Sequence, residues 1–365
     1  MNKPRARHLG IPLEGVPGPL NAITDVAGVA VGHTTLICGD GTLQRGKGPV
    51  RTGVTAILPQ RNELKPLFCS WHSLNGCGEM TGVIWIEESG FLHGPILLTN
   101  THSVGVVKDA AVAWMHERHQ DGYGLNVVTE TYDGYLNDAL GFHVTKGHVF
   151  HALDSAVCGA VPEGNVGGGT GMICYDFKGG IGTASRKLSE EFGGFTLGVL
   201  VQANYGSRRQ LLIAGIPVGL EIPDLMPIKP KPAESAQQSS IVAIVATDCP
   251  LLPHQLKRLA RRVSLGLGRL GAVSESFSGD IFLAFSTAPF GEPDRLGIRQ
   301  VGMYPLDKMD ALFEAVVQAT EEAVLNALIA AETMVGINGY TVYALPHDRL
   351  VSILQKYNRW VNPQQ

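Results

Sequence analysis

Apolar and polar residues follow two periodicities along this chain, and each periodicity predicts one kind of secondary structure. Strict alternation, or a short continuous run of apolar and β-branched residues, predicts a strand. Apolar residues spaced by three and four positions predict an amphipathic helix. Strands are expected at residues 23–35, 53–58, 81–87, 95–99, 197–204, 211–222, 240–248 and 280–287. Helices are expected at residues 105–119, 251–271 and 306–334.

Strands in two groups, mixed with long helices, favour a layered α/β fold. Each element has an apolar face that must be buried against another element, so a sandwich is the natural arrangement. The length of 365 residues allows one large domain or two ordinary ones. No internal repeat with a period of about 20–50 residues is present.

The pattern breaks at residues 226–240, which read MPIKPKPAESAQQSS. Three prolines followed by small and polar residues predict an exposed linker over 226–239. The run SIVAIVATD follows at once and is typical of a fully buried central strand. An exposed linker that leads directly into a core strand places Ser240 at an unusual junction.

Composition narrows the classes of protein. Hydrophobic residues make up 44% and charged residues 17%, which argues for a sizeable core and against global disorder. The net charge is −4 and no basic run alternates with aromatic residues, so nucleic acid is not an expected partner. The basic stretch Lys257–Arg262 is interpreted as the solvated face of a helix. No apolar run reaches the 18 or so residues of a membrane span, so no membrane association is expected.

The cysteines and histidines predict neither disulfides nor a metal site. The six cysteines form no CxxC pair and the N-terminus lacks the apolar core of a secretory signal, so reduced thiols in a cytoplasmic protein are expected. Cys249 is interpreted as a buried thiol. The histidines show no HExxH spacing. The segment GNVGGGTGM at 164–172 fits no phosphate-loop pattern and predicts tight backbone packing instead, so no cofactor is expected.

Ser240 is the first candidate for chemistry. Cleavage of the bond before it would leave an α-amine on the same residue as the hydroxyl. Such an amine titrates near pH 7.7–8.0, which suits a general base, and an N-terminal amine is known to activate Ser and Thr nucleophiles. The alternative is an ordinary linker serine, and Ser239 is a rival for the same role.

Three further segments carry candidate side chains. Ser278 and Asp280 are two positions apart at a strand start and so share a face, where they could orient a nucleophile, although Asp280 could instead cap a turn. Glu130 could bind a substrate ammonium and Tyr132 could donate to an oxyanion, although turn chemistry explains part of this segment. Asn204 ends a buried strand and could donate its amide to an oxyanion, or form a left-handed turn.

Taken together, these segments resemble one known family over nearly the whole chain. The matching stretches are NAITDVAGVAVGHTT, TGVTAILP, LNGCGEMTG, LLTNTHSVG, ETYDGYLND, GNVGGGTGM, VLVQANYG, SIVAIVATDCPLLPHQLKRLARR and SGDIFLAFST, in this order. The chain is similar to the L-aminopeptidase/D-amidase–D-esterase and β-peptidyl aminopeptidase family, also called DmpA-like. This resemblance implies a single domain over 1–365 that folds as a four-layer αββα sandwich, like N-terminal nucleophile hydrolases but with distinct strand connectivity.

The resemblance also implies roles for individual residues. It implies self-cleavage between Ser239 and Ser240, which gives fragments 1–239 and 240–365, although many relatives carry Gly or Asn where this chain has Ser239. Ser278 and Asp280 match the family's serine and acidic pair. Glu130 matches its amine-binding carboxylate. The oxyanion donors match Tyr132 and Asn204.

The expected function is therefore a self-processing serine aminopeptidase that acts through an acyl-enzyme on Ser240. Its substrates would be small peptides, amino-acid amides or esters with an α-L-, D- or β-residue at the N-terminus, and the resemblance implies a homotetramer. Two alternatives stay open: a self-processing acyltransferase of the ornithine acetyltransferase type, and a non-catalytic binding protein in which Ser239–Ser240 is only a linker.

Overall fold

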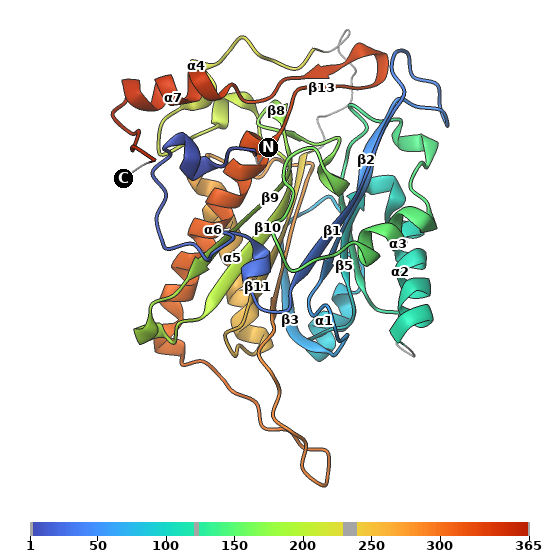
Figure 1. Ribbon diagram of the computed structural model, residues 1–365, viewed down its shortest axis with the longest axis vertical. Helices are drawn as coiled ribbons and strands as arrows, with labels where there is room; N and C mark the ends of the chain where they lie inside the picture. Colours follow the sequence, from blue (N-terminus) through green and yellow to red (C-terminus); the bar gives the residue numbers. More distant parts are fainter. Residues whose placement is uncertain (1–2, 120–123, 229–238, 364–365) are drawn as a thin grey trace.

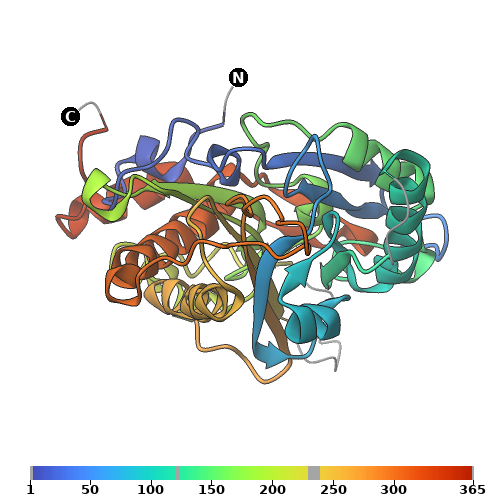
Figure 2. The same cartoon turned by 90° about the horizontal axis from the view of Figure 1, so that it is seen from below.

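The computed structural model consists of four layers in the order helix, sheet, sheet, helix (Figures 1 and 2). It describes residues 3–119, 124–228 and 239–363. One hydrophobic cluster lies between the two sheets, and a further cluster fills the space between each sheet and its helices. In the described part of the chain no helix is both long and apolar enough to cross a membrane.

The smaller sheet has four strands and is covered by two helices. Its strand order is β1-β2-β5-β6, with β5 and β6 parallel and the other pairs antiparallel. The strands are β1 (Ala30–Cys38), β2 (Val50–Leu58), β5 (Ile96–Asn100) and β6 (Val127–Thr131). The helices α2 (Val104–His119) and α3 (Lys146–Asp154) pack on its outer face.

The larger sheet has six strands in the order β4-β3-β12-β11-β10-β9. The strands are β3 (Leu67–Gly76), β4 (Phe91–Leu92), β9 (Gly180–Lys187), β10 (Thr196–Asn204), β11 (Ser239–Thr247) and β12 (Ser278–Ser286). The strands β11 and β12 are parallel. The long helices α5 (Pro253–Arg269) and α6 (Met309–Ala330) cover its outer face.

Strand β11 is buried on both faces along its whole length. Val242, Ile244 and Ala246 point between the sheets, because side chains alternate along a strand. Ile241 and Ala243 point toward the helices α5 and α6. Burial on both faces explains why the sequence here reads as a continuous apolar run.

Short elements complete the chain. Helices and strands outside the sandwich are α1 (Val83–Ser89), α4 (Val218–Glu221), α7 (His347–Lys356), β7 (Ile173–Cys174), β8 (Phe177–Lys178), β13 (Met334–Val335) and β14 (Thr341–Val342). Single turns of 3-10 helix lie at Ala6–Leu9, Ile23–Asp25, Thr101–Ser103, Ala139–Gly141, Gly167–Gly169, Glu190–Phe192, Arg208–Gln210, Leu306–Lys308 and Ile337–Gly339.

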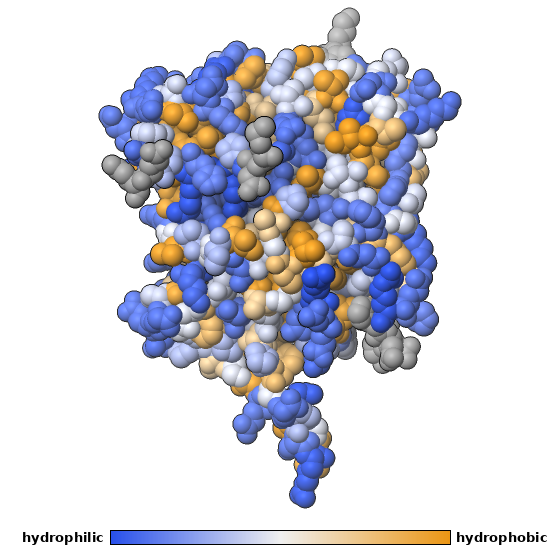
Figure 3. All heavy atoms as spheres, viewed as in Figure 1, coloured by the Kyte–Doolittle hydropathy of each residue, from blue (hydrophilic) through white to orange (hydrophobic). Residues whose placement is uncertain are grey.

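Residues 287–305 connect β12 to the last long helix by way of an arm. Figure 3 shows this arm standing clear of the body of the molecule. Its two sides are joined by a hydrogen bond from Gly291 N to Gln300 O and by another from Asp294 N to Ile298 O. Leu296 and Ile298 are exposed on it.

Most of the predicted elements are confirmed, and two predicted strands are wrong. Residues 81–87 were predicted as a strand but form most of α1, in which Ile86 is buried while Ile84 is 86% exposed. Residues 211–222 were also predicted as a strand. Most of their apolar side chains are buried, although Leu220 is exposed. Ala214 and Gly215 adopt positive φ and turn the chain, and α4 follows.

Other boundaries shift. The predicted strand 23–35 begins only at Ala30, after a 3-10 turn, and the predicted helix 306–334 ends at Ala330. Ser239 already belongs to β11. Of the predicted linker 226–239, residues 229–238 lie outside the described residues.

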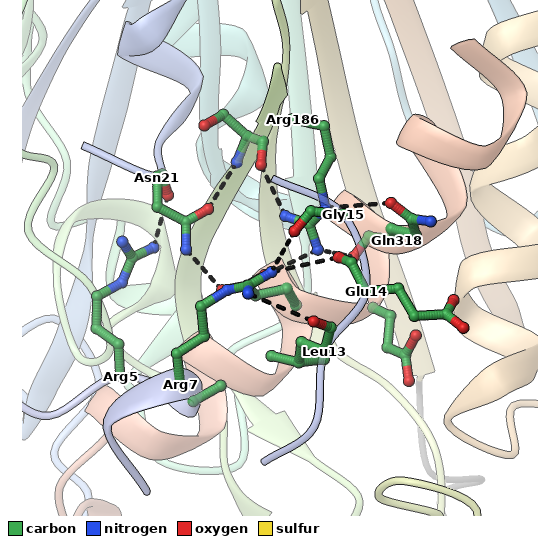
Figure 4. A network of polar contacts seen from close by, with 12 residues as sticks. Arg5, Arg7, Leu13, Glu14, Gly15, Asn21, Arg186 and Gln318 are labelled. Atoms are coloured by element: carbon green, nitrogen blue, oxygen red, sulfur yellow. Dashed lines mark hydrogen bonds and ion pairs between the residues drawn. The ribbon is translucent and has the colours of Figure 1, made fainter. Parts of the chain in front are cut away.

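The N-terminal segment is held on α6 and β9 by a buried polar network (Figure 4). The carboxylate of Glu322 has no exposed surface, and Arg7 Nη2 and Arg186 Nη2 lie 2.9 and 2.8 Å from its Oε2. Asn21 Nδ2 donates to Glu322 Oε1 at 2.6 Å. Burial alone would raise the pKa of Glu322, but the hydrogen bond and charge of Arg7 and the charge of Arg186 bring it below its usual value.

Removal of the Glu322 charge should destabilise the fold. Glu322→Gln leaves two cations near a neutral amide, so the free energy of unfolding measured in urea should fall by about 3–5 kcal/mol. The matched control is Glu332→Gln, which breaks an exposed pair with Lys3 and should cost no more than about 1 kcal/mol. Equal losses in the two variants would contradict a stabilising role for the network.

Candidate active site

Ser240 is the second residue of β11, in the middle of the larger sheet. It is paired with Asn204 of β10 on one side and with Gly279 of β12 on the other. Its side chain points between the two sheets, in alternation with Ile241, and the residue is only 4% exposed. Ser240 and Asn204 are therefore direct cross-strand neighbours on the inner face.

The hydroxyl of Ser240 lies against the peptide bond that precedes it. Ser240 Oγ donates a hydrogen bond to the carbonyl oxygen of Ser239 at 2.6 Å. It accepts one from the main-chain N–H of Gly279 at 3.2 Å. A hydroxyl held beside a carbonyl is in position to attack it, and the same hydroxyl could form an ester.

Ser278 and Asp280 lie on the opposite face of the same sheet. Ser278 Oγ donates to Asp280 Oδ1 at 2.6 Å, and Ser274 donates to the other carboxylate oxygen. Burial raises the pKa of Asp280, and the hydrogen bonds from the two serines oppose this rise. The structure thus places this pair with Ser239, and not with the Ser240 hydroxyl.

Ser239 and this pair line a cavity of about 170 Å³ between the sheet and α5. The hydroxyl of Ser239 accepts a hydrogen bond from Gly206 N at 3.4 Å. In the parallel pairing of β11 and β12, Ser239 is in register with Ser278 and Ser240 with Gly279. Ser278 therefore lies beside the main-chain peptide that joins Ser239 to Ser240. The hydroxyl of Ser240 lies on the other face of the sheet.

Glu130 lies across the gap between the sheets, on β6. Its Oε1 accepts from the main-chain N–H of Glu79 at 3.1 Å, and its Oε2 accepts from the hydroxyl of Thr101. Burial raises the pKa of Glu130, while these two hydrogen bonds act in the opposite direction. The charge of the nearby Glu79 adds to the rise in pKa. Glu130 is 4% exposed, and the negative charge of its surroundings suits the binding of a small cation.

Gly78 lies between Glu130 and the strand pair that holds Ser240. A Cβ at Gly78 would lie 3.3 Å from Glu130 Oε1 and 3.1 Å from the Cα of Gly279. Gly279 in turn donates its N–H to Ser240. One glycine therefore fills the space between the carboxylate and the strand that holds Ser240.

Asn204 is held at both ends of its amide. Its Oδ1 accepts from the N–H of Ile173 at 2.8 Å, and its Nδ2 donates to the carbonyl oxygen of Tyr132 at 3.0 Å. An amide nitrogen carries two hydrogens, so one remains to donate to a ligand. Burial raises the pKa of Tyr132, whose ring packs over Gly134 and lies edge-on to His102.

The structure thus brings Ser240, Asn204, the main chain of Tyr132 and Glu130 together between the two sheets. Ser278 and Asp280 lie on the other face of the larger sheet, toward α5. Sequence reasoning missed Thr101 and Ser274, which bind the two carboxylates. Thr101 falls in the stretch LLTNTHSVG, but nothing in the sequence of Ser274 indicated its positive φ or its contact. Within the described ranges, no group of three or more His, Cys, Asp or Glu residues is arranged to hold a metal ion.

This geometry can support acyl transfer. It has a buried hydroxyl, an amide donor directly opposite it, and a carboxylate that could bind a cationic group near the reacting carbonyl.

Comparisons with known proteins point in the same direction. The sequence profile of peptidase family S58 matches residues 21–342. Beta-peptidyl aminopeptidase BapA of Sphingosinicella microcystinivorans is 51% identical over 368 residues, which cover 98% of this chain and 93% of that protein. BapA of Sphingosinicella xenopeptidilytica is 49% identical over 367 residues, which cover 96% of this chain and 91% of that protein.

A solved structure is similar over the same length. L-aminopeptidase D-Ala-esterase/amidase from Ochrobactrum anthropi superposes with a TM-score of 0.90 at 48% identity and covers 98% of this chain and 100% of that chain. It is described as a prototype for the serine aminopeptidases and as a new variant among the Ntn hydrolase fold. This likeness, together with the four observed layers, confirms the predicted fold class.

Gly279 offers a test of how tightly the site is built. A Cβ there would lie 2.6 Å from the carbonyl oxygen of Cys77 and 2.9 Å from the Cα of Gly78, so the backbone must shift. Gly279→Ala should lower the free energy of unfolding by about 1–3 kcal/mol and impair chemistry at Ser240.

Gly76→Ala is the matched control for this substitution. Gly76 is the cross-strand partner of Gly279, yet a Cβ there would meet only Ser73 Oγ, at 3.8 Å. Urea unfolding of both variants compares them directly. The close-packing account fails if Gly76→Ala is as destabilising as Gly279→Ala.

Proposed function

The chain belongs to peptidase family S58, and from that premise we propose that it is a self-processing serine aminopeptidase with Ser240 as nucleophile. The observation that carries this proposal is the 2.6 Å hydrogen bond from Ser240 Oγ to the carbonyl oxygen of Ser239. It holds the hydroxyl beside the one carbonyl that self-cleavage must attack. A linker serine in water would have no reason to be buried in this geometry.

Self-cleavage would be an acyl shift followed by hydrolysis. Ser240 Oγ attacks the carbonyl carbon of Ser239 and the C–N bond breaks, which transfers the acyl group to oxygen and frees the nitrogen of Ser240 as an amine. Water then hydrolyses the ester. The products are fragment 1–239, with a carboxyl group on Ser239, and fragment 240–365, with a free α-amine on Ser240.

Turnover would use the same two groups. The new α-amine has an ordinary pKa near 7.7–8.0 and can accept the hydroxyl proton as Ser240 Oγ attacks a substrate carbonyl. Ser278 and Asp280 support this amine, because the Ser239–Ser240 bond is in register with Ser278. The two groups of Ser240 are thus served from opposite faces of the sheet. The hydroxyl acts on the face between the two sheets, and Ser278 and Asp280 stabilise the amine from the face that is covered by α5.

Asn204 supports the proposed oxyanion site. Its free amide hydrogen lies on the inner face opposite Ser240. Loss of one such donor typically costs about 10²–10³ in kcat. The hydroxyl of Tyr132, a residue whose main-chain carbonyl accepts from Asn204, is the second donor in this proposal.

Glu130 would select substrates that have a free amine. A buried carboxylate with a second carboxylate, Glu79, nearby would bind an ammonium group and hold the adjacent residue near Ser240. The names of the similar proteins include β-peptidyl and L-amino-acid aminopeptidase as well as D-Ala-esterase and amidase activities. We extend to this chain the class that these share: small peptides, amides or esters with an unblocked N-terminal residue.

An acyltransferase of the ornithine acetyltransferase type is the second candidate. It would form the same ester on Ser240 and pass the acyl group to an amine in place of water. Product release that depends on an added amine acceptor distinguishes it from a hydrolase. Membership of a peptidase family disfavours the non-catalytic alternative.

Assembly with further copies of the chain is also part of the proposal. The arm at 287–305 carries Leu296 and Ile298, which are 74% and 62% exposed on a segment that has little body to pack against. Apolar side chains of this kind are typical of contact surfaces. The homotetramer and the cytoplasmic location stay predictions.

The nucleophile can be tested by substitution. Ser240→Ala should abolish self-cleavage and lower peptidase activity by roughly 10⁴–10⁶-fold, because the attacking oxygen is lost. Ser240→Cys should retain some self-cleavage, since a thiol can make the same acyl shift. Denaturing gels, intact mass and amide hydrolysis rates measure these outcomes.

Ser239→Ala is the control for this experiment. It should still give two fragments, because residue 239 supplies only the carbonyl. N-terminal sequencing of the small fragment decides between the two serines: Ser-Ile-Val-Ala supports Ser240, whereas Ser-Ser-Ile-Val would transfer the role to Ser239.

The role of Glu130 predicts a pH dependence. Its carboxylate binds an ammonium only when ionised, so kcat/KM should fall as the pH drops through its pKa. Because burial raises that pKa, the fall should begin above the range of an exposed carboxyl group. Glu130→Gln should lower kcat/KM by roughly 10²–10³-fold and remove this acidic limb.

N-acetylated substrates provide the matched control. They lack the ammonium, so they should be very poor substrates of the wild type and should not discriminate between wild type and Glu130→Gln. Equal rates on acetylated and free substrates would reject an aminopeptidase in favour of an endo-acting amidase.

A further inference from the structure

Lys178, at the end of β8, has no exposed surface at all. Its Nζ donates to the carbonyl oxygens of Met172 at 2.7 Å and Gly179 at 2.8 Å, with Gly169 O at 3.4 Å. All three acceptors are main-chain carbonyls, and in the described part of the chain no salt bridge to Lys178 is found. A buried ammonium without a carboxylate is costly, so its retention calls for a reason.

Two of these carbonyls, those of Gly169 and Met172, belong to the glycine-rich segment at 164–172. This segment is threaded between the two sheets: a Cβ at Gly168 would clash with Gln202 Oε1 and one at Gly169 with the main-chain nitrogen of Ile181. Backbone confined in this way needs internal partners for its carbonyls. Lys178 supplies donors to two of them, at Gly169 and Met172.

One peptide group connects this lysine to the proposed oxyanion donor. The carbonyl of the Met172–Ile173 peptide accepts from Lys178, and the N–H of the same peptide donates to Asn204 Oδ1 at 2.8 Å. The peptide is planar, so its two bonds cannot be reoriented independently. Asn204 then donates onward to the carbonyl oxygen of Tyr132.

This chain of hydrogen bonds both fixes and polarises Asn204. A bond from an ammonium is stronger than one between neutral groups, and hydrogen bonds in series strengthen each other. A peptide whose oxygen binds a cation is a better N–H donor. The amide it binds through Oδ1 then has more acidic N–H groups. Its orientation is fixed, with Oδ1 toward Ile173 N and the amino group toward the carbonyl oxygen of Tyr132.

We propose that Lys178 is a positioning residue for the oxyanion site, acting through the Met172–Ile173 peptide on Asn204. The proposal rests on the proposed function, because Asn204 stabilises an oxyanion only if Ser240 attacks a carbonyl. Burial lowers the pKa of Lys178 to about 7. The charge that polarises the peptide is therefore lost as the pH rises through neutrality, whereas the neutral amine keeps two N–H donors that position the peptide.

The first test is Lys178→Met, which keeps an unbranched side chain, shorter by one atom, but removes its charge and donors. The mature enzyme should lose roughly 10- to 100-fold in kcat on an amino-acid amide, because a donor to the transition state is misaligned. KM should change by less than about 3-fold, since Glu130 on the other sheet binds the amine. A variant with wild-type kcat overturns the proposal.

A double-mutant cycle identifies the route of the effect. If Lys178 acts through Asn204, then Lys178→Met added to Asn204→Ala should lower kcat by no more than about 2-fold further. Independent effects that multiply would contradict the proposed connection. The rate of self-cleavage, followed by intact mass, gives a second readout of the same cycle.

Lys108→Met is the matched control for stability. Lys108 is also partly buried, and its Nζ donates to Asn126 O at 2.5 Å and Asn126 Oδ1 at 3.0 Å, at the far end of β6 from the site. Its loss should lower the unfolding midpoint in urea but leave kcat unchanged. Equal losses of kcat in the two lysine variants would mean that Lys178 affects kcat only through stability, which contradicts the positioning role.

Lys178→Gln covers the case in which the methionine variant does not fold. Its amide keeps two N–H donors without the charge, so kcat should lie between those of wild type and Lys178→Met. If neither variant accumulates as folded protein while Lys108→Met does, the lysine is required for folding and the positioning role is rejected. An inactive, uncleaved wild type would instead refute the proposed function itself.

Discussion

Burial of β11 on both faces is the constraint on which the rest of the site depends. A strand in the middle of a sheet, covered by helices on one side and by a second sheet on the other, sends successive side chains into different layers. Ser239 and Ser240 are adjacent, yet their hydroxyls lie in separate compartments. Only the main chain passes between these compartments. Chemistry that uses the hydroxyl and the nitrogen of one residue can therefore be supported from both sides without crowding.

Glycines set the distances in this arrangement. The two sheets carry the groups that must meet, and long side chains between them would hold Glu130 away from Ser240. Gly78 allows the loop after β3 to lie between Glu130 and Gly279, and the segment at 164–172 enters the same layer farther along. A Cβ at these positions would meet backbone atoms, which cannot move aside as a flexible side chain can. The close approach is thus a property of the backbone.

The sequence predicted strands such as 95–99, 197–204 and 240–248 well, because burial on both faces leaves a continuous apolar run. The same signal gave the wrong element at 81–87, where α1 buries Ile86 but leaves Ile84 exposed, and at 211–222, where a turn buries most of the apolar side chains. A run of apolar residues does not specify whether the chain is extended, helical or turned. The candidate residues were assigned a common site through the resemblance, since each had a plausible local alternative. That Ser278 and Asp280 lie behind the sheet depends on the register of β11 and β12, which no local pattern specifies. Lys178 was not predicted as a site residue, because its partners are main-chain carbonyls and these leave no pattern in the sequence.

The order of strands in the larger sheet would have a consequence for stability if the chain is cleaved as proposed. A cut before Ser240 assigns β10 to one polypeptide and β11 to the other, although they are hydrogen-bonded neighbours, and α6 of the second polypeptide packs on β9 and β10 of the first. The precursor folds as a single molecule, in a first-order process. A mature enzyme that unfolds becomes two molecules, and its recovery becomes second-order and slows with dilution. The proposed cleavage would therefore make the lifetime of the mature protein depend on its rate of unfolding, and no longer on the equilibrium between folded and unfolded chain.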